Sequence, residues 1–99
     1  MQLQYLIFDP SDDGEGTGSW EAVASVPPDE LSAVMTEVRA VESAAHADAP
    51  GPRGALDDGG VWDLDIQTLP DGHDRVSVTL TLTGPWDWGE ALLGRLIAP

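Results

Sequence analysis

The clearest pattern in the chain is a strict alternation of apolar and polar residues over residues 61–83, which read VWDLDIQTLPDGHDRVSVTLTLT. A period of two is typical of a half-buried strand, and Asp-Gly in the intervening residues 70–73 is typical of a hairpin turn. We therefore predict a β-hairpin with strands over Val61–Leu69 and Arg75–Thr83. Its outward positions are aspartate, glutamine, serine and threonine, so one face is expected to present carboxylates and hydroxyls.

Two further strands are predicted near the N-terminus. Leu3–Phe8 (LQYLIF) is apolar at both odd and even positions, which is typical of a strand covered on both faces, so we place it inside the sheet. Trp20–Val26 (WEAVASV) alternates and is predicted to form a hairpin with it. The intervening Asp9–Ser19 is expected to be an acidic loop, because Pro10 and its glycines interrupt regular structure.

Two amphipathic helices are expected. The first begins at Pro28, has apolar residues at spacings of three and four, places Glu37 on its solvent side, and ends before Pro50. The second begins at Pro85 and has a similar stripe. The segment between the first helix and the hairpin, Asp48–Gly60, is expected to be a mobile loop or a lid without site chemistry of its own.

Together these elements predict an α+β fold. We expect a four-stranded, mainly antiparallel sheet with two helices packed on one face, in the order β-β-α-β-β-α, as a two-layer sandwich forming one domain over residues 1–99. The order of the strands in the sheet is left open. The expected core is Leu3, Tyr5, Ile7, Trp20, Val26, Leu31, Val34, Met35, Val38, Trp62, Leu64, Ile66, Val78, Leu80, Leu82, Leu92, Leu93 and Leu96.

The net charge of the chain limits the kinds of molecule that it is expected to bind. The chain has 18 acidic residues against four arginines and no lysine, for a net charge of −14. Direct binding of nucleic acid or of an anionic membrane requires clustered cations, so neither is expected. A partner attracted by charge should be a basic protein, although high net charge also serves solubility alone. No long apolar run or cysteine is present, and the composition indicates a cytoplasmic, bacterial protein.

The first predicted loop contains a candidate metal site. Asp9, Ser11, Asp13 and Glu15 offer oxygen ligands at alternate positions, with a glycine after Asp13, as at the start of a calcium-binding loop. The position at which such a loop requires a bidentate glutamate is Trp20, so the match is incomplete. An acidic, solvated loop is the competing interpretation.

Catalytic chemistry is not expected. Asp63 and Asp65 share one face of a strand, about 7 Å apart, and paired carboxylates can act as acid and base. Their expected neighbours are serine and threonine on an open face, which would leave both acids ionised. His46 and His73 belong to no recognisable triad or metal-binding spacing. We predict no cofactor and no enzymatic activity.

The tryptophans are the last candidates. Trp20 and Trp62 lie on predicted core faces, whereas Trp86 and Trp88 would lie about 200° apart on a helix and could not both face the core. An exposed aromatic residue beside acids is a plausible anchor for a partner. The candidate partner-binding residues are therefore Asp63, Asp65, Trp86 and Trp88.

Three functional hypotheses follow. The first is a non-enzymatic protein-interaction module, monomeric or a weak dimer, that binds a basic partner. A more specific form is a nucleic-acid mimic or immunity-type inhibitor. The alternative is a small ligand-binding domain or enzyme with a site under the loop over residues 48–60. One contiguous negative face would favour partner binding, and evenly spread acids would favour solubility.

Overall fold

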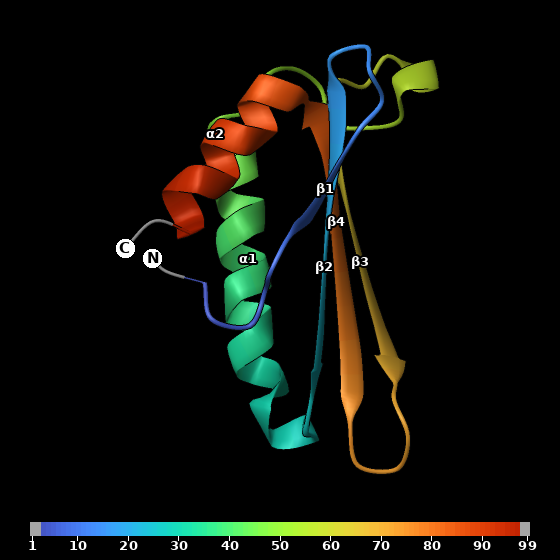
Figure 1. Cartoon of the computed structure of the whole chain (residues 1–99), viewed down its shortest axis with the longest axis vertical. Coiled ribbons are helices and arrows are strands. Elements are labelled where there is room, and N and C mark those ends of the chain that lie inside the picture. Colours follow the sequence, from blue (N-terminus) through green and yellow to red (C-terminus); the bar gives the residue numbers. More distant parts are fainter. Residues whose placement is uncertain (1–2, 98–99) are drawn as a thin grey trace.

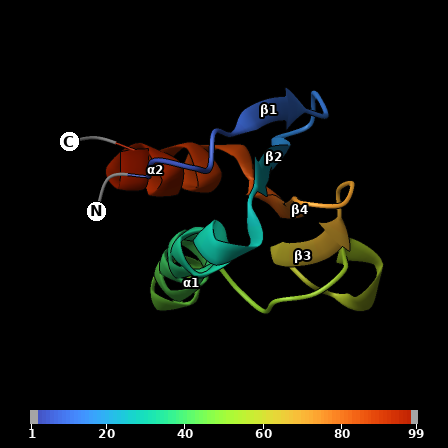
Figure 2. The same cartoon turned by 90° about the horizontal axis from the view of Figure 1, so that it is seen from below.

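The computed structural model describes residues 3–97, apart from the side chain of residue 56, as one antiparallel sheet and two helices. The order of the strands in the sheet is β1-β2-β4-β3, so the two longest strands are central. Both helices lie on the same side of the sheet (Figures 1 and 2), which confirms the predicted α+β fold and element order. The elements are β1 (Asp9–Asp12), β2 (Thr17–Val26), α1 (Leu31–Ala47), β3 (Asp63–Pro70), β4 (Val76–Pro85) and α2 (Trp86–Ile97).

The predicted hairpin is present as β3 and β4, in the register that turns its apolar positions toward the helices. Leu64 pairs with Leu82, which pairs in turn with Trp20 of β2, and all three side chains are buried. A slip of one residue would exchange these side chains for Asp63 and its polar neighbours. The inner face of the sheet and the facing stripes of α1 and α2 therefore form one core, which includes Trp20, Ala22, Val34, Val38, Val41, Val78, Leu80, Leu82 and Leu92.

Three glycines allow α2 to approach the sheet closely. A Cβ atom on Gly89 would collide with the ring of Trp20, one on Gly18 would lie 2.6 Å from the Trp86 ring, and one on Gly84 would lie 2.6 Å from the Trp88 ring. Trp86 stacks on Trp20 with ring centroids 5.4 Å apart, and Trp88 packs against Trp62 at 5.6 Å. The expectation that Trp86 and Trp88 could not both face the core was wrong. Both side chains are half-buried and pack against the core, one on Trp20 and the other on Trp62.

The N-terminal segment differs from the prediction. Residues 3–8 form no strand; they run along the helix layer before the chain enters β1 at the edge of the sheet (Figure 1). Part of the predicted acidic loop, Asp9–Asp12, is strand instead. In the core prediction Ile7 was wrong, since its side chain is 81% exposed while that of Leu6 is buried.

The cause of this difference is Glu37, which was wrongly placed on the solvent side of its helix. Its side chain is buried, and its carboxylate accepts hydrogen bonds from the backbone N–H groups of Gln4, Tyr5 and Leu6 at 2.8–3.1 Å. These amides are consequently not free to pair with a neighbouring strand. Tyr5 adds a hydrogen bond from its hydroxyl to Glu30 at 3.0 Å, which raises the pKa of the Tyr5 phenol. Neither helix of the described chain is long and apolar enough to cross a membrane.

Candidate interaction surface

The outer face of the sheet, opposite the helices, is mainly polar, with Val23 and Leu69 as its exposed apolar residues. No second layer formed by residues 3–97 covers it (Figure 2). It is formed by the odd-numbered residues of all four strands, which the register arranges in rows across the sheet. Serine and threonine run down β4 in its centre, at Ser77, Thr79, Thr81 and Thr83. Because successive side chains of a strand point to opposite faces, these residues are the complement of the buried core positions.

One row concentrates carboxylates. Asp9 of β1 pairs with Glu21 of β2, Glu21 with Thr81 of β4, and Thr81 with Asp65 of β3, so three of four strands contribute an acid. We call these four residues the acidic row. Asp9 and Glu21 are directly opposite each other, which is destabilising for like charges. Among residues 3–97, none of the three acids has a cationic partner or an intramolecular side-chain hydrogen bond.

The neighbouring row leads into a groove. It consists of Ser11, Ser19, Thr83 and Asp63, and a cavity of about 510 Å³ lies over it. The β1–β2 turn forms one wall of the cavity, with Asp12 and Asp13, and residues 54–61 form another, with Asp57. Four carboxylates and several hydroxyls therefore line a single open groove on the outer face.

The carboxylates of the turn are oriented by its backbone. Asp13 Oδ1 accepts hydrogen bonds from the N–H groups of Glu15 and Thr17 at 2.7 and 3.1 Å, and Asp12 Oδ1 accepts one from Gly14 at 2.8 Å. Gly14 has a φ of 79°, a conformation that favours glycine. The turn thus holds one oxygen of each acid in place and leaves the other without a partner among the described residues.

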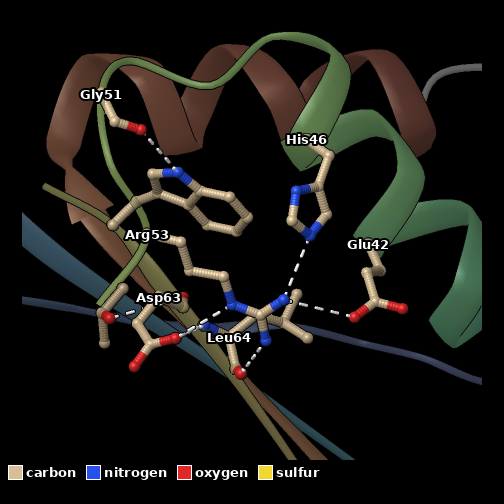
Figure 3. A network of polar contacts seen from close by, with 8 residues as sticks. Glu42, His46, Gly51, Arg53, Asp63 and Leu64 are labelled. Atoms are coloured by element: carbon tan, nitrogen blue, oxygen red, sulfur yellow. Dashed lines mark hydrogen bonds and ion pairs between the residues drawn. The ribbon is translucent and has the colours of Figure 1, made fainter. Parts of the chain in front are cut away.

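Asp63 differs from the other acids of the outer face because it is paired with Arg53 (Figure 3). Asp63 Oδ1 accepts a hydrogen bond from the Leu64 N–H at 2.8 Å and one from Arg53 Nε at 3.2 Å. These bonds, the backbone one above all, lower the pKa of Asp63. The remaining Arg53 contacts are with Leu64 O at 2.7 Å, His46 Nε2 at 3.1 Å and Glu42 at 3.4 Å.

Arg53 also fixes the segment that was expected to be a mobile loop or a lid. Its guanidinium lies 5.4 Å from the Trp62 ring centroid, and its backbone forms a parallel bridge with Trp62. The Trp62 indole donates to Gly51 O at 3.1 Å, and the Trp88 indole donates to Asp48 O at 2.8 Å. No sequence pattern indicates this arrangement, because one arginine among glycines and prolines has no periodicity.

The four predicted partner-binding residues do not come together. Asp63 and Asp65 share the outer face of β3, two residues apart. Trp86 and Trp88 lie in the helix layer and use their ring faces within the core. A surface made of both the acids and these tryptophans is therefore not formed, and the acids alone belong to the candidate surface.

The residues of the predicted calcium site are likewise separated by the strand. Asp9 and Ser11 are on β1, whereas Asp13 and Glu15 are in the turn that follows. Within residues 3–97 no group of three or more histidine and acidic side chains has the geometry to hold a metal ion. His46 contacts the Trp62 ring edge-on at 5.0 Å, and His73 lies in the exposed β3–β4 turn.

Three of the four arginines bind residues outside the acidic row. Arg53 pairs with Glu42 and Asp63, Arg95 pairs with Asp48 at 3.0 Å, and Arg75 donates hydrogen bonds to Ser25. Arg39 is exposed on α1, in the helix layer. Among residues 3–97, none of these arginines forms an ion pair with an acid of the acidic row.

The molecule belongs to the class of small α+β proteins in which helices cover one face of an antiparallel sheet and the other face is open. Comparison with known proteins adds no narrower assignment: no family model, no curated protein and no solved structure matches this chain.

Proposed function

We propose that this protein is a non-enzymatic interaction module whose outer sheet face binds a basic region of a partner protein. The observation that supports the proposal is the acidic row, in which Asp9, Glu21 and Asp65 lie on one face of the sheet without a cationic partner among residues 3–97. Opposed like charges cost stability. Their presence on an uncovered face is explained if a cationic partner neutralises them.

The geometry of the face favours a protein partner with lysine or arginine side chains. Hydroxyls on β4 separate the acids of β2 and β3, so the face offers both charged and neutral hydrogen-bond acceptors. An arginine side chain has five N–H donors and can bond to a carboxylate and a neighbouring hydroxyl at once. A basic nucleic-acid-binding protein is one partner with this chemistry, as expected for a mimic or inhibitor.

The proposal is tested with a fluorescently labelled hexa-arginine peptide and two double variants of equal charge. Glu21→Gln with Asp65→Asn removes two acids of the outer face, and Asp29→Asn with Asp87→Asn removes two exposed acids of the helix layer. We expect the first variant to bind about fivefold more weakly than the second, because it loses two specific ion pairs. Equal affinities would show that net charge alone attracts the peptide.

The groove supports a second candidate, a site for a small cationic ligand. Its wall includes Asp57 of the segment under which a ligand site was predicted, together with Asp12, Asp13 and Asp63. A diamine could contact two of these acids at once. We expect Asp57→Asn to weaken the binding of 1,4-diaminobutane while leaving hexa-arginine binding on the acidic row unchanged, as measured by calorimetry. Absence of heat with the diamine would remove this candidate.

A further inference from the structure

The two edge strands of the sheet, β1 and β3, differ in how well they could pair with a further strand. At the β1 edge the strand has four residues and contains Pro10, which has no N–H group. The β3 edge has eight residues. An open strand edge presents unpaired N–H and C=O groups that can pair with another chain.

The direction of the β3 backbone groups follows from Leu64. Its C=O accepts from Arg53 and its N–H donates to Asp63 Oδ1, so both groups point away from β4. In an antiparallel ladder the residues that point outward alternate with those that bond the neighbouring strand. Ile66 and Thr68 must therefore also direct their N–H and C=O groups outward, and no described group pairs with them.

The same alternation explains the other edge. Leu64, Leu82, Trp20 and Pro10 form one row across the sheet, so Pro10, like Asp12 two residues on, has its backbone facing outward. Proline at that position removes the donor that a further strand would need. At the β3 edge, Arg53 closes one end and Pro70 the other. An open stretch of two outward residues, Ile66 and Thr68, remains between them.

We propose that the basic partner adds an extended segment to this stretch of β3 as a fifth strand. This inference rests on the proposed function and names how the partner binds. Two outward residues supply two donors and two acceptors. On the outer face, the added strand would lie beside Asp65 and Leu69, whose side chain is 59% exposed. The segment should therefore carry a basic residue and an apolar residue four positions apart on the same face.

A second copy of this chain fits the stretch poorly. The self-pairing that uses both Ile66 and Thr68 is centred on Gln67, and it places Asp65 of each copy beside Leu69 of the other. A carboxylate then faces a leucine in both pairs, and two chains of net charge −14 are brought together. Charge complementarity consequently favours a basic segment of a different protein.

The test uses three synthetic peptides of equal length with blocked ends. In TVTTVRT, antiparallel pairing places arginine beside Asp65 and valine beside Leu69. TVTTRVT has the same composition but presents arginine on the opposite face, and TVTTVET reverses the charge. Binding to the ¹⁵N-labelled full chain is followed by NMR through the amides of Ile66, Thr68 and Leu69.

We expect TVTTVRT to shift these amides and to bind about threefold more tightly than either control, the effect of one exposed ion pair. Thr68→Pro should abolish the shifts, since it removes an outward donor and proline is tolerated at such an edge position. Asp65→Arg should reverse the preference in favour of TVTTVET, which keeps the test valid if Thr68→Pro does not fold.

Equal binding of TVTTVRT and TVTTRVT, or self-association of the chain through β3, would overturn the inference. If hexa-arginine and TVTTVRT shift only residues around Glu21 and Thr81 while the β3 edge does not respond, the inference fails and the proposed function stands. If no basic peptide shifts the outer face, both fail.

Discussion

The two faces of the sheet are made by neighbouring residues of the same strands, yet they have opposite properties. On the inner face, Leu80 and Trp20 are buried under two helices. On the outer face, Thr81 and Glu21 occupy adjacent positions in the same strands, where Glu21 is exposed and Thr81 is half-buried. Side-chain alternation therefore separates stability from recognition, and substitutions one residue apart should affect one property without the other.

The largest contrast is expected in β4. Leu80→Ala removes a fully buried side chain and should lower the free energy of unfolding by about 2–5 kcal/mol. Thr81→Ala, one residue away on the outer face, should lower it by about 1 kcal/mol or less, the effect of strand propensity at a half-buried position. Urea denaturation followed by tryptophan fluorescence measures both. Similar losses at the two positions would contradict the assignment of the faces.

In α2, two glycine-to-alanine substitutions are expected to change the stability of the protein in opposite directions. A Cβ on Gly89 collides with Trp20, whereas a Cβ on Gly94 meets nothing within 4 Å. Gly89→Ala should destabilise the protein by about 1–3 kcal/mol through overpacking. Gly94→Ala should stabilise it by about 0.5–1 kcal/mol, because alanine has the higher helix propensity. Thermal unfolding of the pair is the check, and a stabilised Gly89→Ala would rule out the close contact.

On the outer face, removing one acid is expected to increase the stability of the protein slightly. Glu21→Gln removes the repulsion from Asp9 on the neighbouring strand, so it should stabilise the protein by about 0.2–1 kcal/mol. The same substitution should weaken hexa-arginine binding. A variant that is more stable but binds the peptide more weakly is expected if Glu21 serves binding at the expense of stability. Loss of stability would instead indicate that Glu21 has a structural role.

The smallest effect concerns Asp63, the acid of this face that already has a cation. Its lowered folded-state pKa means that ionised Asp63 contributes stability above the unfolded-state pKa, and that this contribution is lost as the pH falls through the folded-state pKa. Arg53→Gln should raise the pKa of Asp63 only partly, because the Leu64 N–H remains. Carboxyl ¹³C NMR titration measures the change, and an unaltered pKa would contradict the pairing.

The sequence predicted the elements that have strong periodicity and missed those held by single side chains. Alternation over residues 61–83 gave the hairpin and its register, and thereby the position of Asp63 and Asp65 on the outer face. The strand assigned to residues 3–8 was wrong because local composition does not reveal that a distant carboxylate, Glu37, takes their amides.

The candidate surface was predictable only in part for a related reason. The acidic row depends on which strands are neighbours, and the order that places β4 between β2 and β3 could not be obtained from local pattern. The groove depends on residues 54–61, which are positioned by Arg53 and Trp62. Long-range contacts of single residues decide both features, and periodicity carries no information about them.

The most direct test of the proposed function is an NMR titration of the labelled chain with hexa-arginine at low and moderate salt. We expect the amide shifts to concentrate on the outer face, around Glu21, Thr81 and Asp65, and to diminish as salt screens the ion pairs. Shifts spread over α1 and α2 to the same extent as over the sheet would contradict the proposed function, and would leave the acids as a source of solubility alone.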